Sequence, residues 1–591
     1  MTARVSPTER IRAEIDELFV SEGDLRLVLE QAARLGARLL LQCALGAEVT
    51  EFLGRDRYVR SASADDAREG STNGYRPLTI KTTAGPLTLS RPKLPGTTRQ
   101  FTAATMQAAP SERARLASGT HSAARLLRHL DGRVDAVDAP SCSGVTAWRA
   151  SASTCRDEFE EVPVGERRDV EVVVVGAGLA GLVAAAVAAR SGASVVLCDV
   201  RAAGGRARSD TREGFVLNQG PHAFFRAGAG ADVLGRLGVH FSGSPPHPVV
   251  LGYTEATGKL ARLPTSAGSL LRSPVLGLAD KARFARLLGR VPKLEPGSFA
   301  TMSAAEWIAS LGLTTRGAGV ISALTRVATY AGDLDLVSAD AAVAQLKLAL
   351  QGVIYLDGGW QSLVDGLEAV ATSGGVRLLE GERATELEAR ADGTFELRTP
   401  TRALRAASVV VATGSPAAAR ALLPHRPAWE LGAPATAACL DLGLRRVPAT
   451  MVAYGLDQPL YLSTHSPKAQ LAPPGGAVVH VMRYGVRAST EDRAQLWALA
   501  RRCGISDADV ITQRFLHEMT VCHALPRPGS GLGGRPAIDA TGTAGVFIAG
   551  DWVGPVGLLA DASLASGEAA GRAAVEHAQR QRASDGAMVG R

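Results

Sequence analysis

The stretch VVVVGAGLAGL, from Val172 to Leu182, decides the fold of the larger part of the chain. Its valine run is typical of a strand that is buried on both faces of a parallel sheet. A G-x-G-x-x-G turn follows, and then an alanine-rich helix is expected. Such a turn lets the backbone approach a pyrophosphate, and the N-terminus of the helix attracts phosphate charge. The predicted phosphate-binding residues are Gly176, Ala177, Gly178, Leu179, Ala180 and Gly181.

A second expected strand, ASVVLCD, ends in an acidic residue, Asp199. It lies about 20 residues beyond the glycines, where a carboxylate can accept a hydrogen bond from a ribose hydroxyl. We include Val200, which follows it, in the predicted site. A glycine motif alone is weak evidence, but strand, glycines, helix, strand and acid occur here in order. The open alternative is a glycine-rich turn of another α/β protein.

The residues after Asp199 read VRAAGGRARSDTREGFVLNQGPHAFF, positions 200–225. Their G-G-R turn and G-F-x-x-N-x-G-P-H segment resemble the family of flavin-dependent amine oxidases, protoporphyrinogen oxidases and phytoene desaturases. The resemblance implies FAD as the cofactor. An arginine fork can bind a phosphate with two hydrogen bonds, although a solvated surface arginine is the alternative. The residues that the resemblance places against FAD are Gly204, Gly205, Arg206, Gly220, Pro221 and His222.

Two later segments extend the resemblance over about residues 168 to 577. GGWQSLVDGLEAVATSGGVRLLEGERATELEA, from Gly358, places Ala384 where a backbone group meets adenine. TAGVFIAGDWVGPVGLLADASLASGEAAGRAA, from Thr543, resembles the closing motif of the family. The resemblance implies that Gly550, Asp551 and Leu559 face the ribityl and pyrophosphate region. A helix cap is the alternative role for the aspartate.

The expected fold class is α/β: an FAD-binding Rossmann-like domain of the GR2 type with an α+β substrate domain. A small, mainly helical N-terminal region with a β-hairpin precedes them. The expected parts are an N-terminal region 1–160, a linker 161–168, FAD-binding parts 169–245, 351–430 and 531–580, substrate parts 246–350 and 431–530, and a disordered tail 581–591.

The implied chemistry is hydride transfer from a substrate to flavin N5, followed by reoxidation by O2 or a quinone. Because the cofactor carries this chemistry, the sequence identifies no catalytic residue and no metal ligand. His222 could lie near the flavin or be a structural loop histidine, and Trp360 could wall the pocket or belong to the core.

The substrate is predicted from the lining segments and the closing motif. PLYLSTHSPKAQLAPPGGAVVHVMRY, from Pro459, looks apolar, and the motif is G-D where amine oxidases of the family have G-E. We therefore expect an apolar substrate, such as an isoprenoid, a polyene or a porphyrinogen. A flavin amine oxidase is the alternative.

The N-terminal region carries another pattern. STNGYRPLTIKTTAGPLTLSRPKLPGTTRQF, residues 71–101, resembles the N-terminal region of Mutator-type bacterial transposases. Its basic residues have no acid among them, so weak DNA contact is expected, with a solvated hairpin face as the alternative. The three-carboxylate domain of such transposases is missing, which predicts an inactive, truncated remnant. Two further functions stay open: a DNA-binding protein with a vestigial flavin domain, and a flavin-binding structural or regulatory protein without turnover.

Composition sets the remaining expectations. The chain has 591 residues, of which 46% are hydrophobic, and its net charge of +7 would not by itself argue for nucleic acid. Seven scattered cysteines without a CxxC pair indicate reduced thiols and a cytoplasmic location. No transmembrane segment is expected, because the uncharged stretch 172–189 is interrupted by its glycine turn. Peripheral membrane contact stays open.

We expect a truncated protein that begins at Val164 to fold, to retain FAD and to keep the activity of the full chain. The reason is that every expected nucleotide-binding element follows Arg168. Flavin content and thermal midpoint, measured side by side for the two proteins, test this. A colourless or insoluble truncated protein beside a yellow, stable full chain would make the N-terminal region an integral part of the fold.

Overall fold

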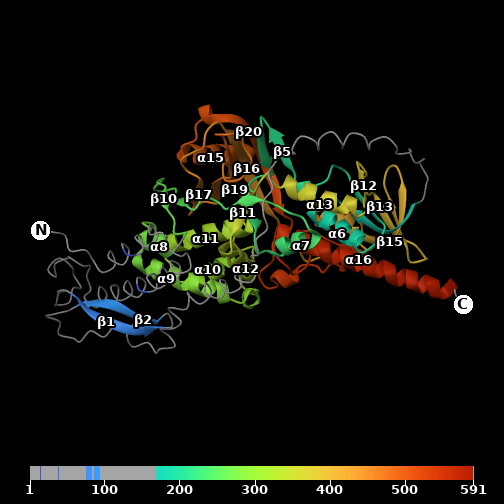
Figure 1. Cartoon of the computed structure of the whole chain (residues 1–591), viewed down its shortest axis with the longest axis horizontal. Helices are drawn as coiled ribbons and strands as arrows, with labels where there is room; N and C mark the ends of the chain where they lie inside the picture. The colour runs from blue at the N-terminus through green and yellow to red at the C-terminus, as the bar shows by residue number, and fades with distance from the viewer. Residues whose placement is uncertain are drawn as a thin grey trace, which may run out of the picture. The chain divides into compact units, whose positions relative to one another are not determined.

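The computed structural model describes residues 75–82, 85–92, 168–265 and 267–589, together with positions 14 and 38 (Figure 1). The chain forms two compact units, Met1–Glu158 and Phe159–Arg591. In the first unit, β1 (Tyr75–Thr82) and β2 (Gly85–Pro92) pair antiparallel, which confirms the expected hairpin. Apart from helical positions 14 and 38, the rest of the N-terminal region lies outside the described residues.

The second unit contains the sheet that is expected to bind FAD, whose strand order is β12-β4-β3-β15-β14-β13, with β21 also paired to β15. Along β3, Val172 and Val174 pack into one hydrophobic core, and Val173 and Val175 into another on the opposite face. Burial on both faces explains the uninterrupted valine run. The parallel strands are β3 (Arg168–Val175), β4 (Val195–Asp199), β12 (Arg377–Glu380), β15 (Ala403–Val411) and β21 (Val546–Ile548); β13 (Glu386–Ala389) and β14 (Phe395–Arg398) are antiparallel.

Helices of small residues cover one face of this sheet: α6 (Leu179–Arg190), α7 (Ala229–Leu237), α13 (Gln361–Ser373) and α16 (Ala560–Val589). Helices α6 and α16 approach closely, because a Cβ atom at Gly571 would lie 2.6 Å from the carbonyl oxygen of Ala184. The predicted disordered tail 581–591 is wrong as far as Val589, which ends α16. Gln581 Nε2 donates to the carbonyl of Asp392, which ties this part of the helix to the turn between β13 and β14.

The expected substrate domain is built on a second sheet, of order β10-β9-β17-β18-β19-β16-β20. One face packs against α15 (Ser489–Arg502), and the other packs against a layer of helices. The strands are β9 (Leu251–Tyr253), β10 (Ala261–Arg262), β16 (Ala435–Leu444), β17 (Val452–Gly455), β18 (Leu460–Thr464), β19 (Ala477–Tyr484) and β20 (Val510–Cys522). The helices are α8 (Ala267–Arg272), α9 (Leu278–Arg290), α10 (Ala304–Ser310), α11 (Thr315–Thr329) and α12 (Ala339–Leu350).

Shorter elements complete the second unit. Two small antiparallel sheets are β5 (Ser209–Arg212) with β6 (Phe215–Asn218), and β11 (Val353–Leu356) between β7 (Phe224–Phe225) and β8 (Gly243–Ser244). The remaining helix is α14 (Pro416–Leu422), and the short 3-10 turns are Gly205–Ala207, Val291–Lys293, Pro296–Phe299, Asp507–Asp509 and Leu532–Gly534. The predicted α/β architecture is thus confirmed, whereas the exact limits of its parts stay predictions.

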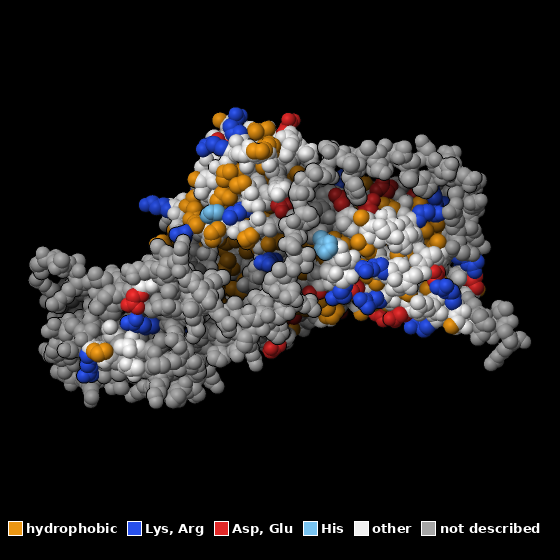
Figure 2. All heavy atoms as spheres, viewed as in Figure 1, with side chains coloured by type: hydrophobic (Ala, Val, Ile, Leu, Met, Phe, Trp, Pro, Cys, Tyr) orange, Lys and Arg blue, Asp and Glu red, His pale blue; other side chains and the backbone are white. Residues whose placement is uncertain are grey.

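Charge is mixed on the described surface of the second unit, where Figure 2 shows Lys and Arg side chains interspersed with Asp and Glu side chains. Within the described residues, no helix combines the length and the apolar composition that crossing a bilayer requires.

We expect Gly571→Leu to lower the free energy of unfolding by about 3 kcal/mol, because the new side chain overpacks the contact between α16 and α6. Gly235 is the matched control, since it also lies in a helix but a Cβ atom there would meet nothing within 4 Å. Gly235→Ala should therefore stabilise the protein by about 0.5–1 kcal/mol. Thermal midpoints of both variants test this, and equal midpoints would contradict the close approach of the two helices.

Candidate cofactor and substrate site

Two glycine turns meet at the carboxyl ends of the parallel strands. Gly178 forms a β-bridge with Gly204, whose N–H donates to the carbonyl of Ala177 at 2.7 Å. A Cβ atom at Gly178 would meet nothing within 4 Å, so the space beside this turn is open. Helix α6 begins here without a side-chain cap and without an acidic residue in its first turn. Uncapped N–H groups beside open space fit a phosphate group.

The residues that are predicted to contact the ribose and adenine of FAD lie together at the edge beside β4. The Asp199 carboxylate accepts hydrogen bonds from the N–H groups of Ala177 (2.7 Å) and Arg201 (2.9 Å). It is half-buried and keeps acceptor capacity for a ribose hydroxyl. The carbonyl of Asp199 accepts from Glu382 N–H, two residues before Ala384, and Val200 is 38% exposed.

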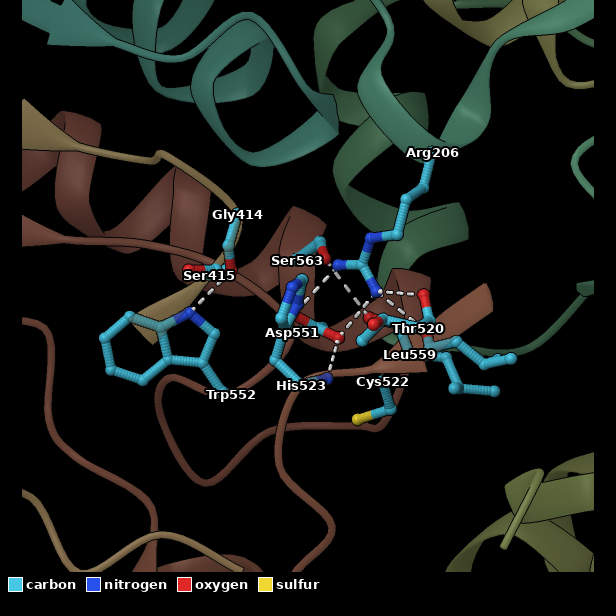
Figure 3. A network of polar contacts seen from close by, with 12 residues as sticks. Arg206, Gly414, Ser415, Thr520, Cys522, His523, Asp551, Trp552, Leu559 and Ser563 are labelled. Carbon is cyan, nitrogen blue, oxygen red and sulfur yellow. Dashed lines mark hydrogen bonds and ion pairs between the residues drawn. The ribbon is translucent and has the colours of Figure 1, made fainter. Parts of the chain in front are cut away.

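The closing motif supplies a fully buried carboxylate, Asp551, which pairs with Arg206 of the second glycine turn (Figure 3). Arg206 Nη2 lies 2.9 Å from Asp551 Oδ1, and Nη1 donates to Oδ2 at 3.0 Å and to the carbonyl of Val521 at 2.8 Å. Asp551 also accepts from the backbone N–H of His523 at 2.9 Å, and the His523 ring lies beside its other oxygen at 3.1 Å. Burial alone would raise the pKa of Asp551, but Arg206 and His523 hold it well below its usual range.

These contacts give the arginine a further role. That its fork binds a phosphate stays a prediction, and the structure shows both Nη atoms bonded to Asp551, whose side chain is fully buried. Arg206 therefore connects the second glycine turn to the closing motif. Leu559, directly before α16, has φ +57, a conformation that is costly for leucine and concentrates at functional sites.

The segment Gly220–His222 continues the site towards the substrate domain. Tyr330 Oη donates to the carbonyl of Pro221 at 2.7 Å. The ring of His222 packs edge-on against Trp360, with centroids 4.9 Å apart, and burial lowers the pKa of His222 to about 4. Trp360 is 5% exposed, yet its buried Nε1 has no hydrogen-bond partner. Trp360 is thus a core residue that also presents an unsatisfied donor.

A cluster of tyrosines, which the sequence analysis missed, lies beyond this segment. Ring centroids lie 5.4 Å apart for Tyr454 and Tyr461, 6.4 Å for Tyr461 and Tyr484, and 6.0 Å for Tyr330 and Tyr484. Burial raises the pKa of each, and of Tyr355, so the hydroxyls are neutral at physiological pH. The segment that begins at Pro459 was predicted to form an apolar lining. It therefore also supplies aromatic rings and hydroxyl groups.

A row of polar side chains also crosses the substrate sheet. Ser463, His480, Asp441 and Arg514 occupy directly opposite positions on β18, β19, β16 and β20. His480 Nδ1 lies 2.6 Å from Asp441 Oδ1, while Arg514 Nε (2.9 Å) and Nη2 (2.6 Å) donate to Oδ2. Cys439 Sγ is 3.1 Å from the same carboxylate. The row is thus an ion-pair network centred on Asp441, in which Arg514 binds Oδ2 and His480 lies beside Oδ1.

We expect Arg206→Ala to lower the free energy of unfolding by about 3 kcal/mol at pH 7, because it leaves the buried Asp551 charge without its main partner. Since the pKa of Asp551 is lowered by folding, this stabilisation is present above the unfolded value of about 3.9 and is lost as pH falls below it. The difference from wild type should therefore shrink at acid pH.

The matched control is Arg236→Ala, which removes an ion pair to Glu568, a carboxylate that is not fully buried, unlike Asp551. It should cost at most about 1 kcal/mol. Denaturant unfolding at several pH values measures both variants. Equal losses of unfolding free energy in the two variants would show that Arg206 behaves as a solvated surface arginine.

The comparisons with known proteins agree with this geometry. Residues 179–468 match the family described as flavin containing amine oxidoreductase. A comparison with curated protein sequences finds no match. An oxidoreductase from Methanosarcina mazei is 18% identical, over 68% of this chain and 99% of its own, with a TM-score of 0.56.

Two further solved structures share the fold. A putative protoporphyrinogen oxidase from Exiguobacterium sp. 255-15 is 16% identical, over 70% of this chain and 100% of its own, with a TM-score of 0.52. Putrescine oxidase bound to putrescine is 15% identical, over 69% of this chain and 99% of its own, with a TM-score of 0.53. The predictions of an enzyme and of its cofactor are confirmed: the chain contains a flavin amine oxidase-like part and is a flavin oxidoreductase that uses FAD.

Proposed function

We propose that this flavin oxidoreductase oxidises an uncharged, largely apolar substrate held beside the tyrosine cluster. The observation that carries the proposal is the pairing of Asp441, which lies on the buried sheet face near these aromatic residues. Its carboxylate is already bonded to Arg514 and His480. A positively charged substrate would find no free partner in this carboxylate.

The proposed FAD site follows the two glycine turns and the edge beside β4. The turns at Gly178 and Gly204 would hold the pyrophosphate, Asp199 the ribose, and the residues around Ala384 the adenine. Gly220–His222 and the Gly550–Asp551 turn would flank the rest of the cofactor. FAD supplies hydride acceptance at N5, and O2 or a quinone would reoxidise it. The protein contributes binding and orientation.

Apolar molecules with unsaturated or aromatic skeletons suit this lining best. Flat rings pack well against the tyrosines, and neutral tyrosine hydroxyls and Trp360 Nε1 would fix their orientation. Polyenes, isoprenoids and porphyrinogens share this character.

A flavin amine oxidase is the second candidate, and the tyrosine cluster favours it too. Stacked tyrosine rings attract an ammonium group through their π faces, even without a carboxylate. Putrescine oxidase and cyclohexylamine oxidase are among the structures with this fold. A single substrate panel separates the two candidates.

The transposase remnant and its weak DNA contact stay predictions for the first unit. The family match begins at residue 179 and does not include this unit. Among the basic residues of 71–101, Arg76 is exposed on β1, which is compatible with either DNA contact or a solvated hairpin face.

The experiment is anaerobic mixing of the yellow holoenzyme with polyenes, porphyrinogens and amines, while flavin absorbance is followed. We expect an apolar polyene or porphyrinogen to bleach the flavin, and air or a quinone to restore the colour. Bleaching by amines alone would replace the proposal with the amine oxidase candidate. A flavin that no panel member reduces would favour a binding protein without turnover.

We expect Gly178→Val to fold but to lose FAD, because open space surrounds this position in the protein while the pyrophosphate would need it. The measurement is flavin absorbance per chain together with the thermal midpoint of the apoprotein. Gly277→Ala is the control, since a Cβ atom there also meets nothing within 4 Å and the position lies before α9, away from the glycine turns. Full FAD occupancy in the valine variant would move the phosphates elsewhere.

A further inference from the structure

His480 is held in one orientation by its neighbours on the sheet. Burial alone would raise the pKa of Asp441, but His480 and Arg514 hold it below its usual range, so this carboxylate is ionised. An ionised carboxylate only accepts hydrogen bonds, and His480 Nδ1 at 2.6 Å must therefore carry the hydrogen. In the neutral imidazole that carries its hydrogen on Nδ1, Nε2 presents a lone pair.

That lone pair has no partner. His480 is 0% exposed, and its Nε2 is buried without any hydrogen bond. A buried polar atom without a partner is costly, and in native proteins it calls for an explanation such as a ligand or a water molecule. The cross-strand neighbour Ser463 does not supply one, because its hydroxyl bonds to Nε2 of His465 at 3.0 Å.

Other unsatisfied atoms gather around the same face of the sheet. The ring of His465 lies edge-on to His480, with centroids 4.5 Å apart, and its Nδ1 is also buried without a partner. Tyr355 stacks on His465 at 3.6 Å. Tyr484 Oη, on the same strand as His480, is unsatisfied as well. Because several polar atoms in one aromatic region lack a hydrogen-bond partner, a single packing defect does not explain them. A bound ligand would supply the missing partners.

The row also contacts the segment that leads to the flavin. Arg514 Nη2 donates to the carbonyl of Asn218, and Nη1 to Asp210 at 2.6 Å. A Cβ atom at Gly220 would lie 3.7 Å from Cys439 Sγ, which is itself bonded to Asp441. The unsatisfied imidazole is therefore connected, through Asp441 and its partners, to the segment that carries Gly220–His222. This is the region that the proposed function assigns to substrate.

We propose that His480 Nε2 accepts a hydrogen bond from the substrate, which is thus an apolar molecule that carries an N–H or O–H donor. Asp441 and Arg514 are positioning residues that fix the tautomer and the orientation of the ring. This inference rests on the proposed function and narrows its substrate class to apolar alcohols or ring N–H compounds.

Two substitutions of His480 separate this contact from a purely structural role. His480→Asn places an amide N–H near the position of Nδ1, so it keeps the bond to Asp441 and removes Nε2. His480→Gln extends an amide towards the position of Nε2 and loses the bond to Asp441. A structural role predicts that the asparagine variant is harmless and the glutamine variant is damaging, whereas a substrate contact predicts the reverse for ligand affinity.

The probes are benzyl alcohol, which carries a donor, and toluene, which has nearly the same shape and no donor. Both are titrated into the holoenzyme while the flavin absorbance is followed, and thermal midpoint and flavin content confirm folding. We expect His480→Asn to weaken benzyl alcohol binding about tenfold and to leave toluene unchanged. His480→Gln should retain benzyl alcohol affinity within about threefold while its thermal midpoint falls. Unchanged benzyl alcohol affinity in the asparagine variant, or no binding to wild type up to the solubility limit, overturns the proposal.

A spectroscopic readout does not depend on turnover. In protein labelled with 15N-histidine, the His480 signals, assigned by their loss in His480→Asn, should show hydrogen on Nδ1 and none on Nε2. Benzyl alcohol should shift the Nε2 signal and toluene should not. Hydrogen on Nε2 in the free protein overturns the proposal. Failure of the proposed function appears separately, as a flavin that no substrate reduces although these shifts are observed.

Discussion

The buried carboxylate of Asp551 is the contact on which the cofactor half of the structure depends. It accepts from Arg206 in the second glycine turn and from His523 beyond the end of β20. The glycine turn thus converges on one charge with two segments that lie more than 300 residues later in the chain. Because a buried charge without partners is strongly destabilising, the pair specifies this arrangement more than it adds net stability. The glycine turn is placed by the closing motif, and not by its own sequence alone.

A second buried carboxylate, Asp441, plays the corresponding part at the substrate sheet. Its partner Arg514 reaches across to Asn218 and Asp210, so the sheet is tied to the segment that carries Gly220–His222. Both networks use one arginine, one fully buried aspartate and one histidine. They differ in the surroundings of the histidine. His523 is partly exposed, whereas His480 is fully buried and its Nε2 has no hydrogen-bond partner. In the second network, Nε2 of His480 is therefore not needed to hold the sheet together and remains able to bind a ligand.

The parts of the fold that could be predicted are those whose physical cause is local. A valine run needs two buried faces, and the G-x-G-x-x-G turn needs a strand before it and a helix after it, so Val172–Leu182 specified strand, turn and helix together. Asp199 could be placed because its distance along the chain from the glycines fixes its position at the end of the neighbouring strand. The start of the predicted tail could not be recognised for the opposite reason, because Gln581 and Arg582 of α16 contact Asp392 and Glu171, which are remote in sequence.

The substrate region could not be predicted because it depends on register. The stretches AACLDLGL, AVVHVMRY and ITQRFLHE look like apolar or mixed strands, and each contains one buried charged or titratable residue that belongs to the row. Only the pairing of β19, β16 and β20 places His480, Asp441 and Arg514 opposite one another, and a slip of one residue would turn each side chain to the other face. A signal was nevertheless present. A buried Asp, His or Arg inside a strand requires a partner, and three such residues in one domain can satisfy one another only if their strands are neighbours. The polar residues that look misplaced in an apolar sheet are thus the ones that define its order and, through His480 Nε2, its chemistry.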